Sequence, residues 1–398
     1  MNSIYSITMR RMQTKSSFSG IIQEMPDVSV DNFERTDSKA YFLSHCHTDH
    51  MSGLFSNALL SHLKKDNVFI YMSEPSAAIV RHQSGVCKDI LDILGSTTIT
   101  IPADEKNGTE EQYITVSLIP AGHCFGSAMF LFRTLYKTIL YTGDFRISTN
   151  SVSKYAQLHE NGKIIRIDAL YVDTTFQNDE HEDFPKRSDS VDLVIQYIKK
   201  WLSMNNTNEV ALHTSARYGY EFVFNKIFEA TDHKVYVDED SWLLYRQFQK
   251  LIPGVTNELK HTRIHKCRNR HEGQSHEACF HPNINKRLQD PKTSFLFIHF
   301  SAYKWRGYKM EDNMVEIKKN NRIDVCFATH CSRSEVTYFV DYLSPKRVVG
   351  FPNVYETGSV EKEMGCKRKG PSAEKLPEVN VKVGRMVDKD LVRQIFED

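Results

Sequence analysis

The sequence contains no run of about eighteen apolar residues, so we expect no transmembrane helix and no membrane partner. Its eight cysteines are scattered without paired short spacings, which argues against a disulfide-stapled scaffold and indicates reduced thiols. Internal repeats and coiled-coil heptads are also lacking. Lysine plus arginine (51 residues) nearly equal aspartate plus glutamate (50 residues), so the net charge of +1 alone says little about partners.

The 398 residues, 40% of them apolar, suffice for one large or two medium domains with a sizeable core. Apolar residues from Val191 to Leu202 predict a helix capped by Ser188 or Asp189. Further elements alternate along the second half of the chain: strands over 210–214, 234–237, 263–267, 295–299 and 323–328, and helices over 220–230 and 332–343. This alternation after residue 176 predicts an inserted α/β domain.

The most informative segment is His45-Cys46-His47-Thr48-Asp49-His50, which follows the apolar run Tyr41-Phe42-Leu43. Three imidazoles and a carboxylate packed so closely suit two adjacent divalent metals. His45 and His47 alternate, so an extended segment can point both at one metal, while Asp49 and His50 can reach a second. The alternative is a polar loop with solvated histidines, but clustered neutral imidazoles beside a carboxylate are costly to pack without a metal.

Two later residues are candidate partners of this segment. His123 and Asp144 each follow a strand-like apolar run, and loops at strand ends are where sites are usually built. His123 and Asp144 would complete the first metal's ligand set with His45 and His47. Asp144 could also bridge to a second metal held by Asp49 and His50.

The ordered set Asp31, His45-x-His47-x-Asp49-His50, His123 and Asp144 resembles the metallo-β-lactamase superfamily. Tyr171-Val172-Asp173-Thr174-Thr175-Phe176 resembles the first motif of its β-CASP branch, in the form carried by the DNA-processing, Artemis-like group. The RNA-processing members usually carry a glutamate-containing segment there. The resemblance covers roughly residues 16 to 355. It implies an α/β fold: a metallo-β-lactamase αββα sandwich with an inserted α/β β-CASP domain.

The resemblance also implies a division of the chain. We expect a flexible arm over 1–20, the first part of the metallo-β-lactamase domain over 21–175, the insert over 176–321, the closing part over 322–360 and a flexible tail over 361–398. The first residues, Met1 to Gln23, are basic and serine-rich with no acid. A mitochondrial transit segment is the alternative to a disordered arm there.

Four residues are predicted by the resemblance to act in catalysis: Asp49, His330, Asp31 and Asp173. Asp31 and Asp173 would orient ligand imidazoles or a loop from behind the metals. His330 lies between an expected strand and an expected helix and matches a histidine that faces the cleft and contacts the scissile phosphate or its leaving oxygen. The alternative for His330 is a structural histidine bonded to the following turn.

A second metal site is predicted in the insert, where Artemis-like proteins have a small structural zinc site. His265, Cys267 and Cys279 match three of its positions, but the fourth falls on Tyr236. Either His271, His276 or His281 supplies the missing ligand, or the site is empty. A histidine-rich loop without a metal is the alternative.

The function implied is that of a metal-dependent DNA nuclease of the nucleus, leaving a 5′ phosphate and acting in double-strand-break end joining or crosslink repair. The expected cofactors are one or two catalytic Zn²⁺ ions, with Mg²⁺ or Mn²⁺ as alternatives in the second position. The expected partners are DNA 5′ ends, hairpins and single- to double-strand junctions, with the catalytic subunit of DNA-dependent protein kinase and DNA ligase IV. From Leu259 to Arg322, fourteen basic residues against six acids would suit DNA phosphates. Such a run is also consistent with a solvated surface.

Three rival functions stay open at the level of sequence. An RNA-processing β-CASP nuclease would use the same metals, although the Asp173 segment argues against it. A thioester or lactone hydrolase shares the histidine core but lacks a large basic insert. A non-catalytic DNA-end scaffold would normally have lost metal ligands.

Overall fold

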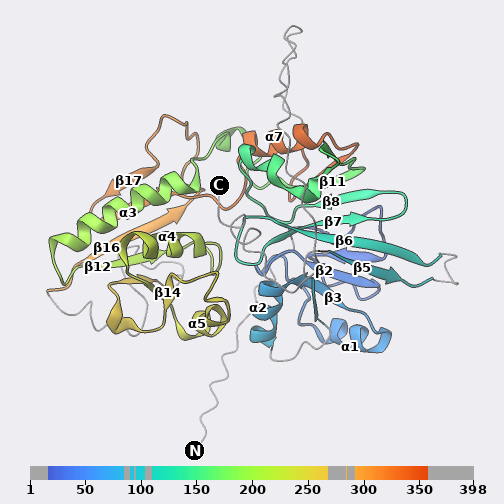
Figure 1. The fold of residues 1–398 in the computed structure, drawn as a ribbon, viewed down its shortest axis with the longest axis horizontal. Helices are drawn as coiled ribbons and strands as arrows, with labels where there is room; N and C mark the ends of the chain where they lie inside the picture. Colours follow the sequence, from blue (N-terminus) through green and yellow to red (C-terminus); the bar gives the residue numbers. More distant parts are fainter. Residues whose placement is uncertain are drawn as a thin grey trace, which may run out of the picture.

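The computed structural model describes residues 17–84, 90–93, 96–103, 110–267, 284 and 292–356. No helix within these ranges is long and apolar enough to cross a membrane. Figure 1 shows two neighbouring units, a sandwich of two sheets and an α/β unit built on a third sheet.

The sandwich contains a parallel four-stranded sheet in the order β1-β2-β3-β4 and a mixed six-stranded sheet in the order β19-β11-β8-β7-β6-β5. The strands of the first are β1 (Val28–Val30), β2 (Ala40–Leu43), β3 (Ile70–Ser73) and β4 (Ile90–Ile93). Those of the second are β5 (Ser96–Ile101), β6 (Gln112–Pro120), β7 (Ala128–Arg133), β8 (Thr138–Tyr141), β11 (Ala169–Asp173) and β19 (Val348–Phe351). A hairpin of β9 (His159–Glu160) and β10 (Lys163–Ile164) lies apart from both sheets in the pairing pattern.

Strand alternation divides the sandwich into layers, because successive side chains point to opposite faces of a sheet. In β2, Phe42 packs between the two sheets against Phe130 and Phe132 of β7. Its neighbours Tyr41 and Leu43 face the other way, into the core that contains helices α1 (Asn57–Asp66) and α2 (Glu74–Ser84).

The six-stranded sheet is covered in the same way by α7 (Arg333–Leu343). Ser332 and Glu335 form a reciprocal capping box that begins this helix. Phe339 packs on Phe145, in the same buried cluster as Leu140 of β8 and Leu170 of β11. The layers therefore run helix, sheet, sheet, helix, which confirms the predicted αββα sandwich.

The third sheet has seven strands in the order β14-β13-β15-β12-β16-β18-β17, parallel except for β17. They are β12 (Glu209–His213), β13 (Val235–Tyr236), β14 (Val255–Thr256), β15 (Ile264–Lys266), β16 (Phe295–Ser301), β17 (Val315–Lys318) and β18 (Arg322–Cys326). Helices α3 (Arg187–Met204), α4 (Glu221–Thr231) and α5 (Glu239–Tyr245) share a buried core with it. Short 3-10 turns occupy Thr149–Lys154, Ala156–Leu158, Asp179–His181, Arg246–Phe248 and Leu259–His261.

Two expectations differ from the structure in detail. Helix α3 begins at Arg187 with Lys186 at its N-cap, so Ser188 and Asp189 lie in the first turn and do not cap it. Strand β18 pairs with β16, so residues 322–326, expected in the closing part of the sandwich, hydrogen-bond within the insert sheet instead. The other domain boundaries stay predictions, and the arm over residues 1–16 and the tail over 357–398 lie outside the described residues.

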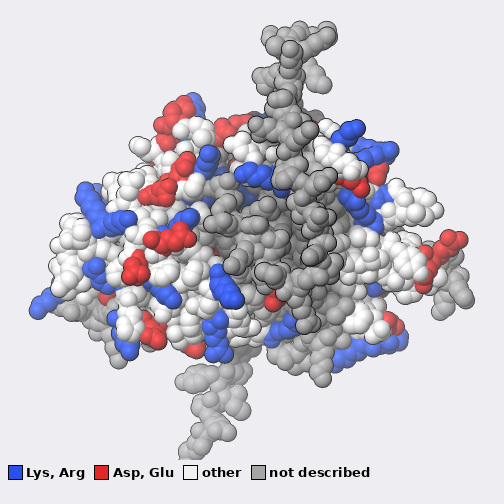
Figure 2. Space-filling view, viewed as in Figure 1, with Lys and Arg blue, Asp and Glu red and all other residues white. Residues whose placement is uncertain are grey.

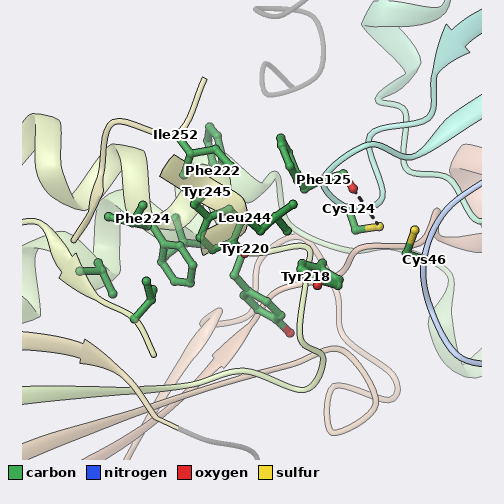
Figure 3. Close-up of a cluster of buried hydrophobic side chains, with 14 of the residues drawn as sticks. Cys46, Cys124, Phe125, Tyr218, Tyr220, Phe222, Phe224, Leu244, Tyr245 and Ile252 are labelled. Carbon is green, nitrogen blue, oxygen red and sulfur yellow. Dashed lines mark hydrogen bonds between the residues drawn. The ribbon is translucent and has the colours of Figure 1, made fainter. Parts of the chain in front are cut away.

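The two units share one hydrophobic core. Figure 3 shows Cys124 and Phe125 of the sandwich beside Tyr218, Leu244 and Tyr245 of the insert. The Phe125 ring, 3% exposed, lies edge-on to Tyr245 at 6.0 Å and to Phe248 at 5.2 Å between ring centroids. Phe125 comes two residues after His123 in the chain, so this apolar contact holds the insert beside the histidine cluster.

Replacing Phe125 with alanine is expected to lower the free energy of unfolding by about 3–5 kcal/mol, because it leaves a cavity between the two units. Urea denaturation followed by fluorescence and circular dichroism measures this loss. Leu135→Ala, at a residue that is 83% exposed, is the matched control and should leave the midpoint unchanged. A Phe125→Ala midpoint equal to that of the control would show that the interface contributes little to stability.

Candidate metal centre

The predicted ligands come together at one edge of the sandwich. His45 comes two residues after the end of β2, His123 three residues after β6 and Asp144 three residues after β8. Strand β8 pairs in parallel with β11, whose last residue is Asp173, so both deliver their carboxylates at the same end.

Asp144 lies at the middle of this cluster. Its Oδ1 is 3.2 Å from His50 Nε2, and its Oδ2 is 3.5 Å from His45 Nε2 and 3.6 Å from His123 Nε2. His47 Nδ1 lies 2.9 Å from His123 Nε2. The structure thus brings together His45, His47, His50, His123 and Asp144, which the sequence predicted as ligands.

In each imidazole, the nitrogen that points away from the centre of the cluster, here called the outer nitrogen, contacts another protein group. His50 Nδ1 contacts the Asp31 carboxylate at 2.9 Å, and His123 Nδ1 contacts the Thr329 carbonyl, also at 2.9 Å. His47 Nε2 lies 3.4 Å from the Tyr218 carbonyl. His45 Nδ1 lies 3.0 Å from the Ser44 hydroxyl, which itself donates to Asp31. The carboxylate and carbonyl oxygens can only accept a hydrogen bond, and the Ser44 hydroxyl has already donated its hydrogen to Asp31. The outer nitrogens are therefore the ones that carry hydrogen in the neutral rings.

The inner nitrogens of His45, His47 and His123 are therefore lone pairs directed at one another and at a carboxylate. His47 Nδ1 and His123 Nε2 face each other, and His45 Nε2 is buried with no hydrogen-bond partner in the described protein. Lone pairs at such distances repel unless a cation lies between them. The residues present fit a divalent metal, because both the donor types and the fixed tautomers are those of ligand imidazoles.

Asp31 is the buried anchor of this arrangement. Its carboxylate accepts hydrogen bonds from the Ser44 amide (2.7 Å), the Ser44 hydroxyl (2.5 Å), His50 Nδ1 (2.9 Å) and the Tyr141 hydroxyl (2.8 Å). Its backbone has a φ of 53°, in the left-handed region that aspartate and asparagine tolerate better than most residues. Asp31 thus lies behind the histidines and orients His50.

The protonation of the metal-free cluster follows from burial and the carboxylates. Burial lowers the pKa of His45 and of His123 well below the ordinary value and also lowers that of His47. Burial opposes protonation of His50 too, but the carboxylates of Asp144 and Asp31 outweigh it and raise its pKa. Burial disfavours the Asp144 carboxylate, yet the facing His50 and His330 lower its pKa well below the usual value.

His330 lies beside the cluster and is oriented by Asp173. Its Nδ1 is 2.7 Å from Asp173 Oδ2, and its Nε2 is 3.9 Å from Asp144 Oδ2. Asp173 also accepts hydrogen bonds from the Thr175 amide and hydroxyl. Burial lowers the pKa of His330, but Asp173 and Asp144 raise it to about 9 overall. Because Asp173 accepts the Nδ1 hydrogen, Nε2 is left to face the site.

Asp49 and Cys124 differ from the other members of the cluster. Asp49 has 43% of its side chain exposed, with Oδ2 3.6 Å from His50 Nε2, so it lies at the open side. The Cys124 sulfur lies within 4.8 Å of ligand nitrogens of His45, His47 and His123. It faces the Phe125 carbonyl at 4.0 Å, and burial raises the pKa of its thiol well above the ordinary value. Asp144 is therefore the better fourth ligand.

The predicted zinc site of the insert is described only in part. His265 and Cys267 are both buried, and His265 is paired with Tyr236 in the register of β15 and β13. Cys279 and the three candidate fourth ligands His271, His276 and His281 lie outside the described residues. The structural zinc stays a prediction.

The basic stretch of the insert is also described in part. Four of its described basic side chains form ion pairs: Lys304 and Arg322 with Asp324, Arg306 with Glu180, and Lys318 with Glu316. On the face drawn in Figure 2, basic and acidic side chains are interspersed over the insert. On this face the described part is therefore mixed in charge rather than uniformly basic.

Sequence reasoning missed several groups at the centre, among them Ser44, the Tyr218 carbonyl and the Ser17 hydroxyl, which lies 3.0 Å from His50 Nε2. Ser44 was adjacent to the motif and could have been considered. The other two come from segments that are 171 and 33 residues distant from their histidines, and only the fold brings them there.

Comparison with known proteins agrees with this geometry. Residues 249–357 match the family described as DNA repair metallo-beta-lactamase. The chain is 32% identical over 362 residues to "Protein artemis" of Rattus norvegicus, which covers 88% of this chain and 50% of that protein. It is 28% identical over 341 residues to "DNA cross-link repair 1A protein" of Gallus gallus, a match that covers 82% of this chain and 32% of that protein. It is 31% identical over 191 residues to "5' exonuclease Apollo" of Mus musculus, a match that covers 47% of this chain and 32% of that protein.

The chain spans about half the length of the Artemis proteins that it matches. The match nevertheless extends over 88% of the chain, which is more than either the sandwich or the insert alone. Sequence motifs, the αββα sandwich and these relatives agree with one another. This chain is similar to the Artemis proteins over most of its length, and its residues 249–357 match the DNA repair metallo-beta-lactamase family.

Proposed function

We propose that this protein is a metal-dependent DNA nuclease that hydrolyses phosphodiesters and leaves a 5′ phosphate. The observation that carries the proposal is the convergence of three imidazoles, those of His45, His50 and His123, on the Asp144 carboxylate, with His47 facing His123 beside them. The similarity to Artemis and Apollo supports DNA as the substrate. A non-catalytic scaffold is disfavoured because each of the predicted ligands lies at the cluster.

Two metal positions follow from the donors. In the first position, His45, His47, His123 and Asp144 would hold an ion, and this nitrogen-rich set suits Zn²⁺. In the second position, Asp49, His50 and Asp144 offer more oxygen and would also admit Mg²⁺ or Mn²⁺. A divalent ion held there supplies charge that polarises the phosphodiester and favours attack by water.

The remaining residues would position the substrate and protect the ligand geometry. Asp31 keeps hydrogen on His50 Nδ1, and Asp173 keeps hydrogen on His330 Nδ1. His330 Nε2 then faces the site, where it would contact the scissile phosphate or its departing oxygen. We place the protein in the nucleus, acting in end joining or crosslink repair. DNA-dependent protein kinase catalytic subunit and DNA ligase IV are proposed as partners from the resemblance alone.

The test is cleavage of a 5′-phosphorylated strand and of a hairpin with an overhang, with and without a chelator. We expect cleavage of DNA that the chelator abolishes and added Zn²⁺ restores. Cleavage of the matching RNA alone would favour the RNA-processing alternative, and turnover of thioesters or lactones alone would favour the small-molecule hydrolase. DNA binding without any cleavage, by a metal-loaded protein, would identify a scaffold.

Arg217 is expected to bind DNA phosphate. Its side chain is exposed and lies over the Tyr218 ring at 5.5 Å, while the next carbonyl, that of Tyr218, touches His47. Arg217→Ala should weaken DNA binding by a similar factor for all DNA sequences. It should also reduce the slope of log binding constant against log salt concentration by about 1. Fluorescence anisotropy over a salt series measures both. Lys137→Ala, in the exposed turn between β7 and β8, is the control, and an equal effect of both variants would argue against a specific phosphate contact.

A further inference from the structure

Ser17 contacts the metal centre from a segment far from the metal motifs. Its hydroxyl oxygen lies 3.0 Å from His50 Nε2, the nitrogen that faces the second position. Neither the metal motif nor the aspartates that orient it include this residue. Because His50 Nδ1 is bound to Asp31, the contact is made on the metal-facing side of the ring.

Three oxygens surround this one nitrogen. Ser17 Oγ lies at 3.0 Å, Asp144 Oδ1 at 3.2 Å and Asp49 Oδ2 at 3.6 Å from His50 Nε2. Ligand atoms bound at about 2.0–2.2 Å to one ion are separated from each other by roughly 3.0–3.6 Å. Each of the three oxygens therefore lies at about this ligand-to-ligand distance from His50 Nε2.

The position of Ser17 is fixed by its neighbour. Phe18 is 6% exposed and packs on Tyr141 at 5.1 Å, Tyr171 at 5.8 Å and Phe351 at 5.2 Å between ring centroids. Tyr141 is the residue whose hydroxyl donates to Asp31. Two residues after Phe18, the Gly20 carbonyl accepts a hydrogen bond from the Val30 amide. The aromatic anchor and the Asp31–His50 pair thus form one packed unit that holds the Ser17 hydroxyl at the site.

We propose that the Ser17 hydroxyl is an oxygen ligand of the second metal position, together with Asp49, His50 and Asp144. The inference rests on the proposed function, because it requires a metal at this centre. A neutral oxygen adds no negative charge, so it raises affinity for oxygen-preferring ions such as Mn²⁺ and Mg²⁺ without favouring Zn²⁺ especially. Ser17 therefore determines which metal occupies the second position.

The test is Mn²⁺ binding to the full chain loaded with one equivalent of Zn²⁺, without DNA, measured by the electron paramagnetic resonance signal of free Mn²⁺. Ser17→Ala should weaken Mn²⁺ binding about tenfold or more. Ser19→Ala is the matched control on the same segment, because Ser19 is exposed and its hydroxyl bonds only the nearby Ile21 amide among the described residues. It should bind Mn²⁺ as the wild type does.

Ser17→Cys separates ligation from a merely structural effect. A thiolate at this position should lower the affinity for Mn²⁺ and raise that for Cd²⁺, with a sulfur-to-metal absorption band in the ultraviolet. Equal Mn²⁺ affinity of wild type and Ser17→Ala would overturn the role of Ser17 while leaving the nuclease proposal intact. Loss of Mn²⁺ binding in Ser17→Cys without a gain for Cd²⁺ would also overturn it. A wild-type chain that binds neither ion would overturn both proposals.

Discussion

Asp49→Ala is expected to reduce DNA cleavage by on the order of a hundred- to a thousandfold or more while leaving the fold intact. The carboxylate lies 3.6 Å from His50 Nε2 and belongs to the second metal position. With 43% of its side chain exposed, it has no role in the core, so its removal should not unfold the protein. Single-turnover cleavage of a 5′-phosphorylated strand, with circular dichroism to verify folding, measures the effect.

Asp66→Ala is the control for this change. Asp66 is 48% exposed and contacts His62 in the same way that Asp49 contacts a histidine, but it ends α1 away from the ligand set. The Asp66→Ala protein should cleave DNA at the wild-type rate. An Asp49→Ala protein that cleaves DNA as fast as the control would contradict the assignment of Asp49 to the metal centre.

Asp31→Asn is expected to lower metal affinity and activity about 10- to 100-fold. An amide placed where the carboxylate accepts from His50 Nδ1 would donate a hydrogen there and move the imidazole hydrogen to Nε2. That nitrogen could then no longer bind a metal. Asparagine also tolerates the left-handed backbone at this position, so the backbone itself should be unchanged. Calorimetric titration of the metal-free protein with Zn²⁺ and Mn²⁺ measures the loss.

Tyr141→Phe distinguishes the tautomer effect from a general loss of hydrogen bonds around Asp31. This variant removes one bond to the same carboxylate but leaves the His50 contact in place. We expect it to cost about 1 kcal/mol of stability and to bind metal nearly as well as the wild type. If Tyr141→Phe and Asp31→Asn lose metal affinity equally, the hydrogen on His50 is not what Asp31 controls.

The ligand set could be predicted from sequence because each ligand follows an apolar strand by two to seven residues. Strands of one sandwich deliver such loops to a common edge, so order along the chain was sufficient. The layers were predicted from the resemblance to the metallo-β-lactamase superfamily, because the apolar run Tyr41-Phe42-Leu43 does not by itself show that Phe42 faces a different core from its neighbours. Local patterns thus predicted the metal motif, and the resemblance predicted the sandwich.

The rest depends on contacts that no local pattern encodes. The Tyr218 carbonyl reaches His47 across 171 residues, and a backbone carbonyl leaves no trace in residue identity. Residue type predicts Ser188 or Asp189 as the cap of α3, but the helix begins at Arg187, directly after Lys186 at its N-cap. The predicted boundary at residue 321 separates β18 from its sheet, because sequence similarity does not reveal which neighbour a strand pairs with.

The shared aromatic contact between sandwich and insert has a consequence for substrate choice. Swinging the insert outward would expose Phe125 and Tyr245 to water, which costs several kcal/mol at about 25 cal/mol per Å² of apolar surface. The insert is thus held rigidly against the sandwich, so under the proposed function the deformation needed to seat a phosphodiester would be borne by the nucleic acid. Frayed ends, flaps and hairpin tips bend more readily than an intact duplex, so pliability of the DNA would act as the selector.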